Sequence, residues 1–479
     1  MIEQVKLKIY IVTAIIMMAV TFYSHAQYDS TYVLKEICVA DCAKEIFGSR
    51  EGGTLGEYDD MYSKRILDVN MELNLYLIDM AEKGSFYASD TISRYTNQVM
   101  RELASNAKLE VFTMGVLIAW DSEVNAFSPG QGSVVLNNGL LAQLTTEEEL
   151  AFVIAHELAH IELDHVLTSI KNIERIKAEI QNLQKAYRKS LLKYDVYTLA
   201  LTDLREEFYE MAEKYREQEL AADSLGYLIY KETYANKTAP LELIELLDIG
   251  SNGGILLGDR LLDDLYFEEY PLQIDWLKGD LSVYAREPDH LGSGLFEVGK
   301  VSTHPFNEKR IVALKQLIAE DVEDGGKRCE VGDSLAMFSE PSLFENVHSL
   351  YKAKSFDKAL YAALQLKSIY PNNSYLSQMI GQVLWQVALT KKSGEFDRFF
   401  NRWTYSYSEE LRLVSNLVRN IDSEQAMYLS YHFMKHSGNF DIHDRSHYEL
   451  LSELCKAMGK KAEHKQLRQR YKVMFSESL

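Results

Sequence analysis

The stretch that decides the fold is TTEEELAFVIAHELAHIELDHVL, residues 145–167. One of its first two threonines can cap a helix, and a glutamate three residues later can complete a capping box. Apolar side chains then recur at the spacing of a single helix face. They are Leu150, Val153, Ile154, Leu158 and Ile161. The sequence therefore predicts a strong helix here rather than a loop.

Within this helix a glutamate lies between two histidines. Positions four residues apart share a helix face, so His156 and His160 direct their rings at one point. Neutral imidazole nitrogen is a Zn²⁺ ligand, and a catalytic zinc site uses three protein ligands and one water. Glu157 can take a proton from a zinc-activated water, which is the nucleophile in such sites. The pattern predicts a peptide-hydrolysing zinc site, whereas a chance match on an ordinary helix is the alternative.

The prediction needs a third ligand. His165 is the nearest candidate, but a metzincin site has a glycine three residues after its second histidine and another histidine three residues further on. Those positions hold leucine and valine here. The better candidate is EQELAADSLGY, residues 217–227, in which Glu219 and Asp223 are one helical turn apart. A glutamate ligand with an aspartate that accepts a histidine N–H is an established arrangement, although a charged helix surface is the alternative.

The composition limits the classes of function. The chain has 479 residues, 47% of them hydrophobic, which is enough for a sizeable core and two to four domains. Its 71 acidic and 51 basic residues give a formal net charge of −20. We therefore exclude nucleic acid as the main partner, because phosphate binding needs a basic face.

Residues 1–26 have the order of a secretory signal peptide. Two lysines precede an apolar run from Ile9 to Tyr23, and small residues end at Ala26. The run is shorter than the ~20 residues that a membrane span needs, so cleavage after Ala26 is expected and a membrane anchor is the alternative. No cysteine follows Ala26, so a lipid anchor is not indicated. The expected location is the periplasm of a Gram-negative-type cell, as a soluble or peripherally membrane-associated protein.

Four cysteines remain after such cleavage: Cys38, Cys42, Cys329 and Cys455. An oxidising compartment permits disulfides, and four cysteines allow three pairings between which the sequence does not choose. Buried free thiols are an equally good interpretation.

The remaining pattern predicts an α+β fold in which helix predominates. Residues 27 to about 110 show helix-like apolar spacing. LEVFTMGVLIAW, residues 109–120, and SVVLNNG, residues 133–139, are typical of strands. NAFSPGQG, residues 125–132, is typical of a turn-rich loop between them.

Beyond the central helix we expect three further regions. The apolar spacing of residues 165–218 predicts two long helices that are separated by a break near Tyr194 and project as a hairpin. Residues 249–301 hold eight of the 25 glycines and predict a lid-like segment, with a surface insertion as the alternative. Residues 340–479 predict a helical domain, in which residues 350–373 are similar to a tetratricopeptide-type helix pair. Only one copy is convincing, so a plain helical bundle is the alternative.

Four motifs together resemble those of metallopeptidase family forty-eight, the HtpX-like and CAAX-protease-like zinc peptidases. They are HELAH (156–160), ELAAD (219–223), NAFSPGQGSVVLNNGLL (125–141) and STHPFNEKRI (302–311). The resemblance covers about residues 85–315. One departure is Gln131, which replaces the second glycine of a Pro-Gly-Gly run and affects loop detail rather than chemistry.

The resemblance implies a zincin-like peptidase domain, with a small mixed sheet, over residues 27–325. It implies that His156, His160 and Glu219 bind one Zn²⁺ per chain. It further implies that Glu157 is the general base and that Asp223 orients a ligand histidine.

The resemblance also implies residues that bind the substrate. His304 and Arg310 would face the cleft and bind the substrate backbone or the developing oxyanion. The alternative for His304 is that it occupies the open zinc position and inhibits the enzyme. Asn125 would help to shape the site, although a turn asparagine is the simpler interpretation.

A substrate strand is expected to add to a free sheet edge, a mode that reads backbone more than side chains and gives broad specificity. The strand expected to present this edge contains Ser133, Val134, Val135 and Leu136.

The expected function is therefore that of an exported, soluble metalloendopeptidase of the periplasmic type, acting in quality control of cell-envelope proteins. The C-terminal helical domain would recruit protein substrates or an outer-membrane or envelope assembly partner. The envelope role rests on resemblance alone. Two other classes remain. One is a chaperone or adaptor in which the helical domain does the main work. The other is a structural metal protein, although structural zinc is usually closed by four protein ligands.

Overall fold

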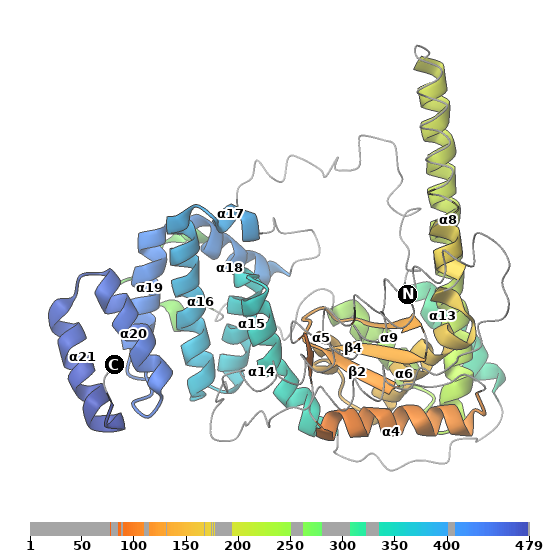
Figure 1. Ribbon diagram of the computed structural model, residues 1–479, viewed down its shortest axis with the longest axis horizontal. Helices are drawn as coiled ribbons and strands as arrows, with labels where there is room; N and C mark the ends of the chain where they lie inside the picture. The colour runs from red at the N-terminus through yellow and green to blue at the C-terminus, as the bar shows by residue number, and fades with distance from the viewer. Residues whose placement is uncertain are drawn as a thin grey trace, which may run out of the picture.

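The computed structural model confirms an α+β fold in which helix predominates. A mixed four-stranded sheet lies among helices on one side of the molecule, and an all-helical part lies on the other (Figure 1). No helix in the described part of the chain is long and apolar enough to span a bilayer. The structure describes residues 77, 85–87, 90–109, 115–130, 132–166, 168–173, 175, 177, 194–250, 262–279, 307–321, 335–400 and 408–477.

Several predicted features lie outside these described residues. They are the signal segment 1–26, Cys38, Cys42, Gln131, His304 and Cys329. The fourth cysteine, Cys455, is described and is a buried free thiol, whose pKa burial raises to about 11.

The sheet has the strand order β1–β2–β4–β3. β2 (Gly115–Ala119) and β4 (Ser133–Asn137) run parallel in its centre, and every residue of both strands is buried. Central parallel strands are covered on both faces, which explains their nearly continuous apolar sequences. β1 (Phe86–Tyr87) pairs antiparallel with β2, and β3 (Ala126–Gly130) pairs antiparallel with β4.

The predicted loop over residues 125–132 is wrong in part, because it contains the edge strand β3. Ala126 lies opposite Leu136, and a bulge follows between Phe127 and Gly130. A proline that lacks an N–H donor is tolerated at an edge strand or a bulge, so Pro129 does not prevent pairing there. The turn-like composition therefore marks an irregular edge strand.

The predicted free edge is also wrong. β4 has a hydrogen-bonded neighbour on each side, so its main-chain groups are already paired. Among the described strands the outer position next to β4 belongs to β3. The side chains predicted to contact a substrate are at most 4% exposed and contribute to the core; they are Ser133, Val134, Val135 and Leu136.

α6 (Glu147–Glu162) carries the central motif and begins at its predicted cap. The Thr146 hydroxyl accepts a hydrogen bond from the Glu149 N–H at 3.2 Å, and the Glu149 carboxylate accepts one from the Thr146 N–H at 3.0 Å. This reciprocal pair satisfies two N–H groups that the first helical turn leaves free. The cap therefore fixes where α6 starts.

α8 (Tyr194–Lys231) is a single helix of 38 residues that begins at the predicted break and continues through Glu219 and Asp223. Its first half projects from the body of the peptidase-like part (Figure 1). Its second half crosses α6 closely at Gly226, where an added Cβ would lie 3.0 Å from the His156 Cα. Gly226 therefore permits this close approach, and Ala222 one turn earlier is buried as well.

Three more helices complete this part of the molecule: α4 (Asp90–Asn106), α9 (Ala239–Gly250) and α13 (Asn307–Glu320). α4 and α9 contact α6, and α13 contacts α8 and α9. They share one apolar core with the two central strands.

The C-terminal part is all-helical, as predicted for residues 340–479. Its helices pack on one another and enclose a second apolar core, against which α21 packs through α20. Its members are α14 (Ala336–Lys352), α15 (Phe356–Ile369), α16 (Ser374–Ser393), α17 (Phe396–Phe399), α18 (Glu409–Asn420), α19 (Ser423–Lys435), α20 (Arg445–Ala457) and α21 (Lys461–Phe475).

α14 joins the two parts. The short helix α5 (Asn138–Leu141) follows β4, and the Asn138 amide donates to the Ser342 carbonyl at 3.0 Å. Further along α14, Val347 and Leu350 belong to the C-terminal core. One continuous helix thus packs on the sheet domain at its start and on the helical part at its end.

A portion of the predicted lid packs against the C-terminal helices instead. Residues 262–279 contain the 3₁₀ helix η3 (Asp263–Leu265) and α10 (Ile274–Leu277). Trp276 is 4% exposed within the C-terminal core. The Asn420 amide of α18 donates to the carbonyl oxygens of Trp276 and Lys278 at 3.1 and 2.8 Å. These contacts make residues 262–279 part of the helical domain's structure.

We predict that Trp276→Ala destabilises the C-terminal domain by about 3–5 kcal/mol, because it removes a buried indole and leaves a cavity. Ile274→Ala in the same helix is the control: its side chain is 74% exposed, so a change within about 0.5 kcal/mol is expected. Urea unfolding followed by circular dichroism measures both. Equal effects of the two substitutions would show that the segment is not docked.

Candidate active site

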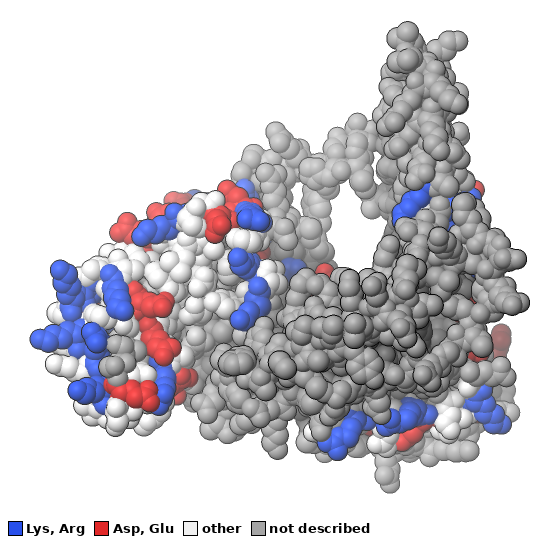
Figure 2. Space-filling model, in the orientation of Figure 1, with Lys and Arg blue, Asp and Glu red and all other residues white. Residues whose placement is uncertain are grey.

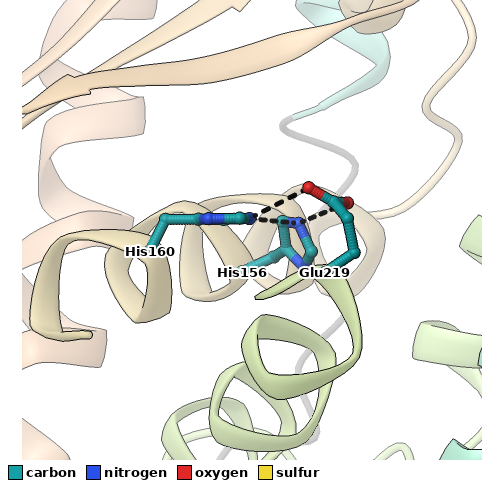
Figure 3. A group of neighbouring side chains, drawn as sticks. All are labelled: His156, His160 and Glu219. Atoms are coloured by element: carbon teal, nitrogen blue, oxygen red, sulfur yellow. Dashed lines mark hydrogen bonds and ion pairs between the residues drawn. The ribbon is translucent and has the colours of Figure 1, made fainter. Parts of the chain in front are cut away.

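Three side chains from two helices converge on one point (Figure 3). α6 contributes His156 and His160, whose Nε2 atoms are 3.1 Å apart. α8 contributes Glu219, whose carboxylate oxygens lie 3.7 Å from Nε2 of His156 and 3.5 Å from Nε2 of His160. All three are at most partly exposed, so the cluster lies at the surface of the core rather than in open solvent.

The spacing of these atoms fits a zinc ion. Ligand atoms placed tetrahedrally at ~2.0–2.1 Å from Zn²⁺ lie about 3.4 Å apart. The three observed separations, 3.1, 3.5 and 3.7 Å, scatter around that value. Two imidazoles and one carboxylate are also the donor set of a catalytic zinc site, which keeps its fourth position open. The sequence-predicted set is therefore brought together in a geometry that could hold the metal.

Asp223 lies one turn beyond Glu219 and contacts the other ring nitrogen of His156. Its Oδ1 is 3.0 Å from Nδ1 of His156. An N–H donated from Nδ1 leaves the Nε2 lone pair free to bind a metal ion. Burial lowers the pKa of His156, but contacts with Asp223 and Glu219 outweigh it and raise this pKa to about 10. Metal binding at His156 must therefore displace a proton.

Arg310 holds Asp223 from the opposite side. Its Nε and Nη2 donate to the two Asp223 oxygens at 2.8 and 2.7 Å, a bidentate pair. Burial would raise the pKa of Asp223, but hydrogen bonds from Arg310 and His156 hold it below its usual value. Arg310 is 9% exposed, so it differs from the substrate-binding residue that we expected. Its guanidinium is engaged with Asp223 and supports the ligand histidine.

Glu157 is buried beside the cluster, with 6% of its surface exposed. Burial raises its pKa to about 7, in spite of the opposing charge of His156. The main-chain N–H of Ser128, in the edge strand β3, hydrogen-bonds to the carboxylate. A carboxyl group with a pKa near neutrality can both accept and return a proton at physiological pH.

The sequence interpretation missed two contacts of this site. One is the Ser128 N–H, which no side-chain pattern could reveal because it is a main-chain group. The other is His165, which we rejected as a metal ligand. Its Nδ1 lies 2.9 Å from Nδ1 of His160, on the side of that ring away from the cluster. Burial lowers the pKa of His160 to about 3, so this ring stays neutral.

Asn125 is not brought to the cluster. The Asn125 side chain is exposed, and its carbonyl accepts a hydrogen bond from the Asn137 N–H at 3.0 Å at the start of the β3–β4 pair. This contact uses the main chain, so the structure assigns no role in the site to the Asn125 side chain. His304 lies outside the described residues, so its two predicted roles stay predictions.

We predict that Gly226→Ala weakens both folding and metal binding. Alanine favours helix by about 1 kcal/mol over glycine, but overpacking against rigid main chain costs about 1–3 kcal/mol. The atoms that the new methyl meets are the His156 Cα and N, at 3.0 and 3.1 Å. Ala221→Ser adds one atom at an exposed position of the same helix and is expected to be nearly neutral. Thermal unfolding and zinc retention measure both, and an unchanged Gly226→Ala protein would contradict this account.

Comparison with known proteins agrees with this geometry. Residues 91–318 match the model of peptidase family M48. The chain is 31% identical over 160 residues to the mitochondrial metalloendopeptidase OMA1 of Arabidopsis thaliana, covering 33% of this chain and 30% of that protein. It is 25% identical over 113 residues to the beta-barrel assembly-enhancing protease of Yersinia pestis, covering 23% of each. The protein of that name from Escherichia coli K12 is 24% identical over 112 residues, again 23% of each.

The matched region spans less than a third of each of these relatives' own length. The family match over residues 91–318 contains both ligand helices, strands β2, β3 and β4, and the Asp223–Arg310 pair, and it ends before the C-terminal helices. Residues 91–318 are therefore similar to peptidase family M48, which supports a metallopeptidase in this part of the chain.

Proposed function

We propose that this protein is a zinc-dependent metalloendopeptidase. The observation that carries the proposal is the convergence of two histidines and one glutamate around an open position, with a fourth acidic side chain, Glu157, buried beside them. A structural metal site would need a fourth protein ligand, and the cluster has three members among the described residues.

The residues of the site have different roles in peptide hydrolysis. Zn²⁺, when bound, supplies a Lewis acid that polarises the scissile carbonyl and lowers the pKa of a water molecule to about 7. Glu157 takes the proton from the attacking water and returns it to the departing amine nitrogen. Its pKa of about 7 suits both transfers. Asp223 and Arg310 keep the His156 ring in the orientation that metal binding requires.

We further propose that an extended substrate segment adds to β3 rather than to β4. Among the described strands, β3 is the outer one next to β4, and its main chain already contacts Glu157 through Ser128. A substrate paired with this strand would lie beside the metal ligands. Main-chain pairing reads little of the side-chain sequence, which supports broad specificity.

We further propose a location and a class of natural substrates. Residues 1–26 have the composition of a secretory signal, which supports export to the periplasm. Some relatives are named as beta-barrel assembly-enhancing proteases, which supports proteins of the cell envelope as substrates and an envelope assembly partner for the helical domain. The chain's own helical domain offers a surface for such recruitment.

The decisive variant is Glu157→Gln, which keeps the shape of the side chain but cannot accept the proton. We expect it to retain one zinc per chain and to lose casein cleavage by about 10²–10⁴-fold. Glu162→Gln, an exposed position at the end of the same helix, is the matched control and should cleave like the wild type. Zinc is measured by atomic absorption and cleavage by release of labelled peptides.

Two outcomes would contradict the proposal. A wild-type protein that binds no zinc would show that the cluster is not a metal site. Equal cleavage by the wild type and Glu157→Gln would assign the activity to a contaminant and favour an adaptor in which the helical domain does the main work.

A further inference from the structure

His165 reaches the site through an unusual turn. α6 ends at Glu162, and Asp164 then adopts a left-handed conformation with φ of 52°. Few residues other than glycine adopt this region, although aspartate tolerates it better than most. The turn is closed by hydrogen bonds from the Asp164 N–H to the Ile161 carbonyl at 3.1 Å and from the Thr168 N–H to the Asp164 carbonyl at 3.0 Å. The chain therefore folds back, and His165 lies against the last turn of α6.

The contact that results is specific. The Nδ1 atoms of His160 and His165 are 2.9 Å apart, and the two rings meet edge to face at 73°. His165 is 9% exposed, so water does not readily replace it. One of the two Nδ1 atoms must carry the shared hydrogen. If Nε2 of His160 binds a metal ion, its Nδ1 carries the hydrogen, so His160 donates and His165 accepts.

We propose that His165 is a positioning residue for the zinc ligand His160. It accepts the Nδ1 hydrogen of His160, which fixes the ring's orientation and its tautomer. This inference rests on the proposed zinc site. His165 is no ligand itself, because its Nδ1 faces the side of His160 away from the metal position.

The two ligand histidines are thus supported in different ways without adding net charge. His156 has the carboxylate of Asp223, whose charge is balanced by Arg310. His160 has a neutral ring, because a protonated His165 could not accept the hydrogen bond. The supporting groups leave the negative charge of Glu219 as the ligand set's only formal charge. A metal ion held in this way keeps more of its positive charge for the substrate carbonyl.

The test compares three variants of the full chain. His165→Leu removes the acceptor, and His165→Asn keeps one, because Oδ1 of asparagine occupies nearly the place of Nδ1. We expect zinc to pass to a chromogenic chelator about 10–100-fold faster from His165→Leu than from the wild type. His165→Asn should restore most of the retention. Asp164→Gly, which keeps the turn accessible, should behave like the wild type.

The unfolding midpoint of the zinc-free protein distinguishes positioning from mere packing. If His165 acts through His160, the zinc-free midpoints of the leucine and asparagine variants agree while their zinc release differs. Equal zinc release from both variants and the wild type overturns the inference and leaves the zinc site intact. A wild type without zinc overturns the proposed function instead. If His165→Leu does not fold, Asp164→Val provides the test, because a β-branched residue disfavours the turn that places His165.

A second, independent observation concerns the last helix. Residues 456–472 contain seven Lys or Arg and one Glu, in a chain whose net charge is −20. Four of these cations recur at intervals of four, three and four, so they form one row along α21, and all are exposed. They are Lys461, Lys465, Arg468 and Lys472. Figure 2 shows blue side chains gathered at this end of the helical domain, distant from the sheet domain in Figure 1.

Acidic side chains lie at the same end of the helical domain (red in Figure 2), but the row does not pair with them. None of its four members forms an ion pair with any residue that the structure describes. Two acidic residues at this end are engaged elsewhere: Glu463 with Tyr431 and Lys435, and Glu477 with Arg445. Just beyond the row, the Val473 side chain is 82% exposed, so an apolar side chain lies next to the last cation.

We infer that α21 binds the surface of an anionic lipid bilayer. A straight row of cations matches a flat layer of negative headgroups, and the exposed Val473 next to Lys472 can enter its interface. An acidic protein segment would pair with the cations, but it would bury less of the exposed apolar surface next to them.

Co-sedimentation with vesicles tests this inference. We expect the full chain to bind phosphatidylglycerol-containing vesicles at least tenfold more tightly than pure phosphatidylcholine vesicles, and to be released by high salt. Replacing all four row residues by glutamine should abolish the preference. A control that replaces four other exposed cations, Arg101, Lys108, Lys352 and Lys358, should keep it. Binding to polyglutamate without binding to the anionic vesicles, or equal binding by both variants, overturns the inference.

Discussion

The close crossing of α6 and α8 is the constraint on which the site depends. Neither helix holds a metal site alone, because His156 and His160 provide two ligands and Glu219 the third. The helices approach so closely at Gly226 that even a methyl group would press on the main chain of His156. This approach brings the Glu219 carboxylate to 3.5–3.7 Å from the two imidazoles. A wider crossing would leave two half-sites that could not share one ion.

A chain of charges and hydrogen bonds then sets the orientation of the ligands. His156 contacts Asp223, and Asp223 is held by Arg310 from α13, 87 residues further along the sequence. His160 contacts His165, which a left-handed turn returns to α6. Glu157 is held by the edge strand β3. The sheet, the turn after α6 and α13 thus each contribute one contact to the same small site, which explains why a domain of this size surrounds three ligands.

The helical domain is joined to the sheet domain through α14, and it also holds a segment that precedes α13 in the sequence. α14 packs on α5 at its start and in the C-terminal core at its end. In the sequence, residues 262–279 follow the ligand helices α6 and α8 and precede α13. In the structure, however, Trp276 contacts α18 of the helical domain. The predicted lid therefore has a packed portion. Its aromatic side chains bury a large apolar surface in the core, and detaching the segment would expose that surface to water. Glycine content alone did not distinguish a lid from a docked segment.

The sequence by itself determined those features of this protein that depend on short-range contacts along the chain. The capping box, the helical period and the spacing of His-Glu-x-x-His with Glu-x-x-Ala-Asp follow from contacts within one or two turns, so they could be predicted residue by residue. The tertiary structure decided which strand lies at the edge, that Arg310 pairs with Asp223, that His165 meets His160, and that Gly226 permits the helix crossing. Each of these depends on the relative placement of elements through packing, main-chain pairing or a rare backbone conformation. No periodic pattern in the sequence records such placement, because it arises only when separate elements share one core.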